Sequence, residues 1–358
     1  MKPVTYAVLD LEAVQHNLVK VRQIAADAKI MAVIKANGYG HGLLRIAKAL
    51  GDVDAMAVAR IDEAIRLRKA GFNQRLAVLE GFMNADELEA FFAYDLEAMI
   101  HCVEQVELIE NRAGQGQLSI WLKLDSGMNR LGFKEIEFAK AHQRLNLCSL
   151  VSTINLMTHF ANADDKNDAK TLGQIRLFKQ TVKNYQGECS IANSAGILAW
   201  KEALTDWVRP GIMLYGISPF AEETGQQLGL KPVMSLYSQL IAIKEIQKGE
   251  TVGYSGTWAA EKTTRVGVVA IGYADGYPRH AKIGTPVLVN GQRVPLIGRV
   301  SMDMITVDLS SLSNAKTYDP VTLWGEGLAV EEIAIFADTI PYTLVCGVTQ
   351  RVQILDKL

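Results

Sequence analysis

The sequence predicts an α/β protein in which an N-terminal (β/α)8 TIM-type barrel is followed by a mostly β domain. Short apolar runs alternate with amphipathic stretches over the first two-thirds of the chain, as expected for a parallel sheet covered by helices. Beyond about residue 231 the runs become rich in β-branched residues and helical periodicity almost disappears. A chain of 358 residues also exceeds what one hydrophobic core usually supports. We therefore predict two domains, residues 1–231 and 232–358.

Eight apolar runs are the predicted barrel strands, because eight strands in roughly 210 residues suit a closed barrel better than an open sheet. These strands are expected at Ile30–Ile34, Ala55–Ala59, Leu76–Leu79, Leu96–Ile100, Ile120–Leu124, Thr153–Met157, Cys189–Ala192 and Val208–Tyr215. Helices are expected between them at Asp62–Ala70, Asn84–Ala93, Val103–Asn111, Lys134–Leu145 and Asp168–Tyr185. The alternative is an open doubly wound sheet, which is disfavoured because no GxGxxG motif opens the first helix.

The second domain is predicted to consist mainly of strands. They are expected at Ser235–Ile246, Thr264–Ile271, Pro286–Val289, Val294–Ile297, Met304–Leu309 and Val321–Trp324. Asn290-Gly291 between two of them predicts a hairpin, because both residues tolerate a positive φ angle. Helical periodicity returns only near Val330–Ala337.

The bulk composition is that of an ordinary soluble enzyme, with 49% hydrophobic and 21% charged residues. A formal net charge of −2 without a basic block argues against binding to nucleic acid or to an anionic membrane. No stretch has the pattern of a secretory signal or the length of a membrane span. Four cysteines without a CxxC pair indicate thiols in a reducing compartment. We expect a cytoplasmic protein.

Lys35 directly follows the apolar run that ends at Ile34, and a loop rich in glycine comes next. A partly desolvated lysine at a strand end can act as a nucleophile and form a Schiff base. A lysine in such a place is, however, more often an ordinary surface residue. The segment around Lys35 and the rest of the chain decide between the two interpretations.

Other polar side chains stand where further predicted strands end or, for the eighth, begin. They are Lys123, Asp125, Arg130, Thr158, His159, Asn193, Ser194 and Arg209, and Gly211 stands two positions after Arg209. In a barrel, functional side chains collect at the carboxyl ends of the strands. Together with Lys35, these residues predict a cationic pocket suited to a phosphate and a carboxylate. Taken singly each is weak evidence, and His159 alone could equally be a structural histidine.

Five segments, in this order along almost the whole chain, resemble the alanine racemases. The segments are AVIKANGYGHG around Lys35, KLDSGMNRLGF around Arg130, VRPGIMLYG around Arg209, VGYSGTW around Tyr254 and GRVSMDMITVDL around Met302. The resemblance implies an isomerase that binds pyridoxal 5'-phosphate and interconverts L-alanine and D-alanine. It implies a supply of D-alanine for peptidoglycan or for alanine catabolism.

The resemblance assigns two catalytic bases on opposite faces of the cofactor. Lys35 matches the cofactor lysine and is expected to act on the α-proton of D-alanine. Tyr254 matches the catalytic tyrosine and is expected to act on the α-proton of L-alanine. Removing a proton from one face and returning one to the other requires two such groups. In the family, Tyr254 and Met302 reach the active site of the other subunit, so an isologous homodimer is implied.

The resemblance also assigns residues around the cofactor and the substrate. Arg130 matches the arginine that holds the substrate carboxylate and lies on the phenolic-oxygen side of the cofactor. Lys123 matches a lysine that members of the family often carry as a carbamate. Arg209 matches the arginine that faces the pyridine nitrogen, and His159 is expected to connect Arg209 to the second base. An arginine keeps its proton, so it leaves that nitrogen unprotonated and weakens the electron sink, which fits racemisation without transamination.

The remaining matched positions surround the phosphate and the substrate entrance. The phosphate is expected to be held by Tyr39, Ser194, Gly211, Ile212 and Tyr342, and Asn193 is expected to bind the cofactor as well. Tyr273 and Met302 match positions near the entrance and the substrate carboxylate, with Met302 acting through its backbone. The tail CGVTQRV departs from some family members and is expected to lie outside the chemistry.

Several alternatives follow from the same residues. A related pyridoxal-phosphate decarboxylase would carry an acidic residue in place of Arg209. A non-catalytic cofactor carrier would not need the region after Lys231, and a metal hydrolase would need several histidines at the barrel mouth. A racemase that also accepts serine stays open, because an apolar pocket discriminates against one added hydroxyl by only about 100-fold. No metal site is predicted.

Overall fold

The computed structural model describes residues 3–357 and divides the chain into two compact units. The barrel unit comprises Asn17–Leu214. The β unit comprises the segment that ends at His16 together with the chain from Tyr215 onward. These units differ from the predicted domains 1–231 and 232–358 at both ends of the barrel segment.

Pairing between distant parts of the chain explains this difference. Strand β1 (Tyr6–Leu9) pairs antiparallel with β10 (Met234–Ile246) and parallel with β18 (Gln353–Asp356), so the first residues belong to the β unit. The segment after Leu214 belongs there because the carboxylate of Glu331 accepts hydrogen bonds from two of its backbone N–H groups, at 2.7 and 2.8 Å. The amino-acid composition of these two segments does not predict their contacts with distant parts of the chain.

The barrel unit contains a closed ring of eight parallel strands, which confirms the barrel and excludes the open sheet. The strands are β2 (Lys29–Val33), β3 (Ala55–Val58), β4 (Arg75–Val78), β5 (Glu97–Ile100), β6 (Leu118–Lys123), β7 (Val151–Met157), β8 (Cys189–Ser190) and β9 (Trp207–Val208). The ring closes where β2 pairs with β9, with Lys29 opposite Trp207. The strands are buried on both faces, which explains why they are continuous apolar runs.

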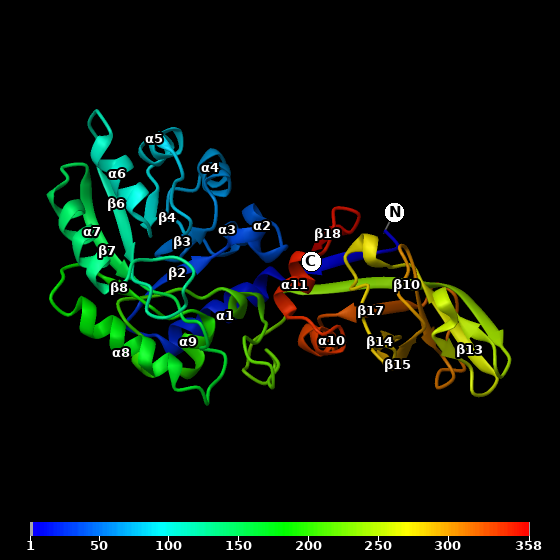
Figure 1. Cartoon of the computed structure of the whole chain (residues 1–358). Helices are drawn as coiled ribbons and strands as arrows, with labels where there is room; N and C mark the ends of the chain where they lie inside the picture. Colours follow the sequence, from blue (N-terminus) through cyan, green and yellow to red (C-terminus); the bar gives the residue numbers. More distant parts are fainter. Residues whose placement is uncertain (1–2, 358) are drawn as a thin grey trace. The chain divides into compact units, whose positions relative to one another are not determined.

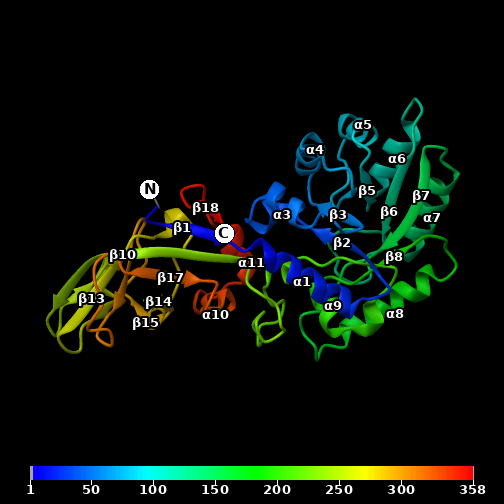
Figure 2. The same ribbon diagram turned by 180° about the vertical axis from the view of Figure 1, so that it is seen from behind.

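Helices surround the strands (Figure 1). They are α1 (Leu11–Ile24), α2 (Lys35–Tyr39), α3 (Leu43–Ala49), α4 (Ile61–Lys69), α5 (Ala85–Ala93), α6 (Val103–Asn111), α7 (Glu135–Leu147), α8 (Lys170–Val182) and α9 (Ser194–Ala199). All five predicted helices are present, and α1 and α9 are seen best in Figure 2. Asn84 caps α5 by accepting the N–H of Glu87 at 2.9 Å. Within the described residues, no helix is long and apolar enough to cross a membrane.

The predicted eighth strand, Val208–Tyr215, is wrong beyond Val208, because the structure places the strand at Trp207–Val208. Strand β9 ends at Val208, and Ile212–Tyr215 form a turn of 3-10 helix. Pro210 lies between them and has no N–H to donate to a neighbouring strand. Its carbonyl oxygen still accepts the N–H of Val33 at 2.9 Å, so the chain stays attached to the barrel.

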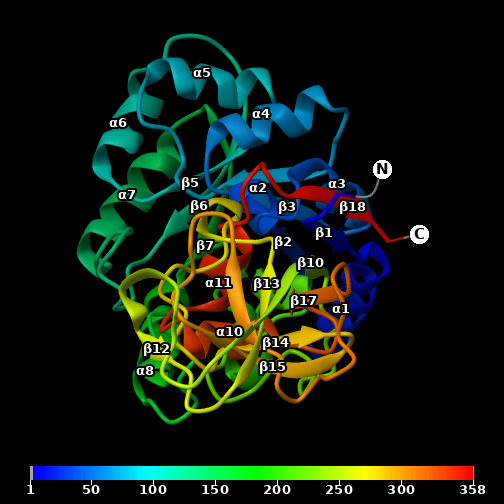
Figure 3. The ribbon, with the colours of Figure 1, turned by 90° about the vertical axis from the view of Figure 1, so that its right-hand side faces the viewer.

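The β unit is built on an eight-stranded sheet in the order β13-β16-β15-β14-β17-β10-β1-β18, and β10 also pairs with β13. Its further strands are β11 (Thr251–Val252), β12 (Trp258–Ala259), β13 (Thr264–Val269), β14 (Pro286–Val289), β15 (Gln292–Ile297), β16 (Ile305–Asp308) and β17 (Pro320–Trp324). Asn290-Gly291 joins β14 to β15 in the predicted hairpin. Figure 3 shows β14, β15 and β17 side by side. The unit also contains α10 (Val330–Phe336) and α11 (Pro341–Cys346).

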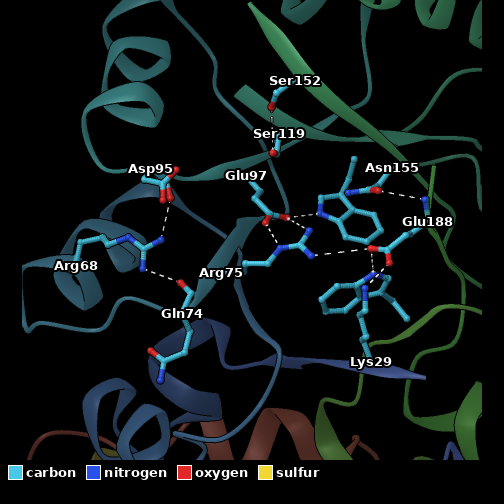
Figure 4. A network of polar contacts seen from close by, with 12 residues as sticks. Lys29, Arg68, Gln74, Arg75, Asp95, Glu97, Ser119, Ser152, Asn155 and Glu188 are labelled. Carbon is cyan, nitrogen blue, oxygen red and sulfur yellow. Dashed lines mark hydrogen bonds and ion pairs between the residues drawn. The ribbon is translucent and has the colours of Figure 1, made fainter. Parts of the chain in front are cut away.

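A layer of ion pairs and indole rings fills the amino end of the barrel (Figure 4). The carboxylate of Glu97 accepts hydrogen bonds from Arg75 at 2.5 Å and from the indole N–H of Trp121 at 2.7 Å. Glu188 accepts the indole N–H of Trp207 at 2.6 Å, and Arg75 lies over the Trp207 ring at 4.6 Å. Residues at this end of a barrel usually contribute to the stability of the fold and not to catalysis.

Removing the Glu97 carboxylate should therefore weaken the fold. Glu97→Ala leaves the Arg75 guanidinium and the Trp121 N–H without their acceptor, and we expect the free energy of unfolding to fall by about 2–4 kcal/mol. Urea unfolding measures the change. The control is Glu89→Ala, which breaks an exposed ion pair with Arg112 and should leave the transition midpoint in place. Equal effects of the two substitutions would contradict the role given to Glu97.

Candidate active site

The carboxyl ends of the barrel strands carry the predicted site residues. Lys123 is the last residue of β6, His159 follows β7 by two positions, and Arg209 directly follows β9. Lys35 lies two residues beyond the end of β2, at the first position of α2. Because parallel strands of a barrel all end at the same rim, these three cations and one imidazole converge on one mouth.

Lys35 opens a turn of unusual handedness. Ala36, Asn37, Gly38 and Tyr39 have φ angles of 53°, 55°, 62° and 51°, so the short helix α2 is left-handed over these residues. The left-handed conformation costs an L-residue other than glycine roughly 1–2 kcal/mol. The glycine-rich sequence predicted a loop here but gave no indication of its left-handed conformation. Such backbone strain persists only where neighbouring groups impose it.

Arg209 is buried and held on three sides. Its guanidinium donates to the Ser190 hydroxyl at 2.7 Å, to the carbonyl oxygen of Thr158 at 2.6 Å and to Nδ1 of His159 at 3.3 Å. Burial lowers the pKa of Arg209 to about 10, so the group keeps its charge at neutral pH. The predicted pairing of Arg209 with His159 is therefore present in the barrel unit. Ser190 and Thr158 were not predicted as supports, because buried hydroxyls and carbonyls leave no pattern in the sequence.

The electrostatics of Lys123 show how closely the cations gather. Burial, with the positive charges of Arg209, Arg130 and Lys35, lowers the pKa of Lys123 to about 8, against an opposing effect of Asp125. Burial and the same cations, Arg209 foremost, hold the pKa of His159 well below its usual value of 6.5. His159 is therefore neutral. The cluster has an excess of positive charge and suits an anionic ligand.

The loop that carries Arg130 is organised by Asp125. The buried carboxylate of Asp125 accepts the N–H groups of Gly127 and Asn129 at 3.1 and 2.9 Å, and it pairs with Lys134 at 2.8 Å. Gly132 allows the loop to pack closely against this strand end, since a Cβ there would lie 2.8 Å from the backbone nitrogen of Asp125.

A small cradle lies beside the left-handed turn. The Ser194 hydroxyl accepts the N–H groups of Gly211 and Met213 at 2.9 and 3.3 Å. A Cβ at Gly211 would come within 2.6 Å of the Tyr39 hydroxyl oxygen, so only glycine fits there. Hydroxyl groups such as those of Ser194 and Tyr39, next to an excess of cations, are of the donor type that fits a phosphate. The structure thus brings Tyr39, Ser194 and Gly211 together, as predicted.

Two further predicted cofactor residues border this cradle. Ile212 is buried at the start of the 3-10 turn, and Asn193 caps α9 by accepting the N–H of Gly196 at 2.9 Å. Tyr342 lies in α11 of the β unit.

The hairpin of β11 and β12 presents Tyr254. Val252 pairs with Trp258 across the hairpin, and it packs in a small apolar cluster with Val266 and Ile297. Tyr254 begins the connecting turn, and its side chain is 68% exposed in the single chain. The hydroxyl is therefore carried on an anchored turn and is available for contact with another surface.

Tyr273 and Met302 occupy two turns of the β unit that are bonded to each other. The N–H of Tyr273 donates to Ser301 at 3.0 Å, and a Cβ at Gly272 would come within 2.3 Å of the Met302 carbonyl oxygen. The tail contributes as well, because Arg351 pairs with Asp275 at 3.3 Å and with Asp303 at 2.9 Å. The tail was expected to lie outside the chemistry, but it fixes the two turns on which Tyr273 and Met302 stand.

The buried histidines predict acid-sensitive stability. Burial lowers the pKa of His41 to about 4, whereas an unfolded histidine titrates near 6.5. Between these pH values the unfolded chain binds more protons, so the free energy of unfolding should decrease by up to about 3 kcal/mol as the pH falls from 6.5 to 4. His159 acts in the same direction. Urea unfolding at several pH values should show a smaller pH dependence for His41→Asn, and an unchanged one would contradict this account.

Family models match both parts of the chain. The model described as the N-terminal domain of alanine racemase matches residues 9–219, and the C-terminal domain model matches residues 233–355. The alanine racemase of Aliivibrio salmonicida is 49% identical over 348 residues, which cover 97% of each chain.

Solved structures agree over the whole length. The biosynthetic alanine racemase from Pseudomonas aeruginosa is 44% identical, with a TM-score of 0.97 over 100% of both chains. The alanine racemase from Bartonella henselae, solved with covalently bound pyridoxal phosphate, is 28% identical, with a TM-score of 0.90 over 99% of this chain and 100% of that one. These matches confirm the resemblance found in the five segments, and the chain belongs to the alanine racemase family.

Proposed function

We propose that this protein is an isomerase that interconverts L-alanine and D-alanine with pyridoxal 5'-phosphate as its cofactor. It would supply D-alanine for peptidoglycan or for alanine catabolism. The observation that carries the proposal is the cluster at the barrel mouth, in which buried Arg209 and Lys123 lie near Lys35 and Arg130 around a neutral His159. The lysines and arginines of this cluster provide positive charge for a phosphate and a carboxylate. The neutral imidazole of His159 adds no charge.

The donor set of the mouth fits the cofactor. Lys35 would hold it covalently, and Arg209 with His159 would face its ring nitrogen. Its other contacts would come from Tyr39, Arg130, Asn193, Ser194, Gly211, Ile212 and Tyr342. When bound, pyridoxal phosphate supplies an electron sink that stabilises negative charge at the α-carbon of the amino acid. Because Arg209 is fixed and keeps its proton, it limits that sink and favours rapid return of a proton to the α-carbon.

Two groups of the chain would move the α-proton. The Nζ amine of Lys35 takes the proton of D-alanine or returns one on the same face. The hydroxyl oxygen of Tyr254 does so for L-alanine on the opposite face. Arg130 and the Met302 backbone, with Tyr273, would bind and orient the substrate. Racemisation requires both faces to be served, so both bases must be present in one site.

We propose that a homodimer completes each site. The exposure of Tyr254 and of Met302, which is 53% exposed in the single chain, supports a role for both in contacts with a second copy. An isologous dimer would give two equivalent sites, each with Lys35 from one chain and Tyr254 from the other.

We also propose a cytoplasmic location. Cys102, Cys148 and Cys189 carry free thiols, and their spacing suits no disulfide framework. Such thiols are stable in a reducing compartment. Fractionation of the source cells with an antibody to the chain tests this location.

We further propose that Lys123 is carbamylated. A lysine with a pKa near 8 is partly unprotonated at neutral pH, unlike a lysine at its ordinary 10.5. The free amine can attack carbon dioxide: an N–C bond forms, one proton leaves to water, and a carbamate anion results. One positive charge is thereby replaced by one negative charge beside Arg130 and Arg209, which reduces the excess charge and orients the arginines.

Carbon-13 NMR with labelled bicarbonate measures this modification. We expect a carbamate resonance in the wild-type protein that weakens as the pH falls below about 8, because the amine becomes protonated. Lys123→Met should lack the resonance, whereas Lys201→Met, at an exposed lysine, should keep it. A resonance that persists in Lys123→Met would contradict the assignment.

The activity itself is tested by incubating the protein with pyridoxal phosphate and L-alanine in D2O. Chiral chromatography with mass detection should show D-alanine that carries deuterium at the α-carbon. Tyr254→Phe should lower kcat/KM by about 10²–10⁴-fold in both directions, since the equilibrium constant is fixed. Lys35 remains in this variant, so D-alanine should still exchange its α-proton without inversion, whereas L-alanine should not.

Two controls complete this experiment. Lys35→Ala should lose activity, exchange and the absorbance of the lysine-bound cofactor. Mixing Lys35→Ala chains with Tyr254→Phe chains should restore activity, because a hybrid dimer contains one intact site. No D-alanine from the wild-type protein would refute the function, and no recovery in a verified hybrid would refute the shared site.

A further inference from the structure

The left-handed turn after Lys35 is contacted by two buried side chains, Glu63 and His41, that have no role in the proposed reaction. The turn begins at the proposed cofactor lysine, and residues 36–39 all have positive φ angles. Its internal bonds are few: the N–H of Gly38 donates to Ile34 at 2.9 Å, and the N–H of Gly40 donates to Ala36 at 3.0 Å. A conformation that L-residues avoid needs further support.

Glu63 supplies support on one side. It lies in the first turn of α4 and is buried. One carboxylate oxygen accepts the N–H of Asn37 at 2.9 Å, and the other accepts the N–H of Ala59 at 3.3 Å. Ala59 follows β3, the strand next to β2 in the barrel. Glu63 therefore ties the middle of the left-handed turn to the neighbouring strand end.

His41 supplies support on the other side. Its imidazole is fully buried, and Nδ1 lies 2.8 Å from the carbonyl oxygen of Tyr39 and 3.1 Å from that of Gly38. Both partners are acceptors, so Nδ1 carries the proton and donates to them. The ring is neutral, since burial lowers the pKa of His41 to about 4. The two carbonyls are thereby turned toward the imidazole, which fixes the end of the turn.

Asn37 joins the turn to the next helix. Its side-chain oxygen accepts the N–H of Leu43 at 3.0 Å, at the start of α3, and its carbonyl oxygen accepts the N–H of Gly42 at 2.8 Å. The N–H, the side chain and the carbonyl of Asn37 are thus all engaged. Because the chain leaves Lys35 directly into this fixed geometry, the backbone of Lys35 cannot rotate without breaking these contacts.

We propose that Glu63 and His41 are positioning residues that hold the left-handed turn 36–39 and thereby fix the direction of the Lys35 amine. This proposal deepens the proposed function and rests on Lys35 being the cofactor lysine and a base. A displacement of a reacting group by about 1 Å can cost 100-fold in rate, so loosening the turn is expected to act on kcat. Substrate binding depends on other residues, so KM for alanine is expected to change little.

The test uses Glu63→Gln and His41→Leu in the holoenzyme. Each should lower kcat by at least about tenfold while KM for L-alanine stays within about twofold. Amide hydrogen exchange, measured on peptides covering residues 35–42, should become faster, because the N–H groups of Gly38 and Gly40 lose the supported turn. Thermal unfolding and exchange in the other barrel strands report whether the fold is retained.

Two matched variants separate positioning from general damage. His41→Asn places an amide donor where Nδ1 stood and should restore kcat and slow exchange at residues 35–42. Glu104→Gln changes an exposed glutamate in the first turn of α6 and should leave both readouts at wild-type values. This control matches Glu63 in residue type and in helix position.

Each outcome decides the proposal. Unchanged kcat and unchanged exchange at residues 35–42 in both test variants would overturn it. Loss of the folded barrel in both would also overturn it, because the two residues would then support the fold as a whole. If the wild-type protein produced no D-alanine, the proposed function would fail, while the exchange measurement would still decide whether Glu63 and His41 hold the turn.

Discussion

The buried guanidinium of Arg209 is the constraint on which the barrel mouth depends. Arginine cannot release its proton, and here it is held by Ser190, Thr158 and His159 at the end of the shortest part of the strand ring. Together with burial, this permanent positive charge lowers the pKa of the neighbouring His159 and Lys123. His159 stays neutral, and the pKa of Lys123 falls to about 8 because of burial and the nearby cations. The excess of positive charge at the barrel mouth therefore favours the binding of an anion.

The two ends of the barrel handle buried charge in opposite ways. At the amino end, Arg75 is matched by Glu97 and Glu188, and indole N–H groups complete the acceptors. Those charges are balanced within the protein and contribute to stability. At the carboxyl end the cations gather beside two buried carboxylates, Asp125 and Glu63, each of which accepts backbone N–H groups of a neighbouring loop or turn. An unbalanced cluster is costly to fold and is kept where a ligand supplies the missing charge.

Most of the barrel could be predicted because buried parallel strands are continuous apolar runs. For the same reason Lys123 and His159 could be placed at strand ends, whereas Arg209 was expected at the start of the eighth strand and instead follows β9. The hand of the turn after Lys35 could not be predicted, since Ala36 carries no preference for positive φ and the contacts of Glu63 and His41 arise only in the folded chain. The place of β1 in the sheet of the β unit could not be predicted, because its partners lie more than 200 residues away. The role of Ser190 as a hydrogen-bond acceptor for Arg209 could not be predicted, because no sequence pattern distinguishes it from other buried serines.

The residues of the proposed reaction come from both units of the chain. Groups that must be fixed and charged, such as Arg209, stand on the barrel, whose closed sheet resists displacement. Tyr254, Tyr273 and Met302 are uncharged and stand on turns of the β unit, where they are exposed in a single chain. Exposed apolar and aromatic side chains on anchored turns suit an interface, because burial there adds binding energy without new charge. If a second copy covers them, as proposed, the second base enters the cationic mouth only in the dimer. The monomer would then keep an anion-binding pocket that lacks one of its two bases, so assembly and activity would be coupled through Tyr254.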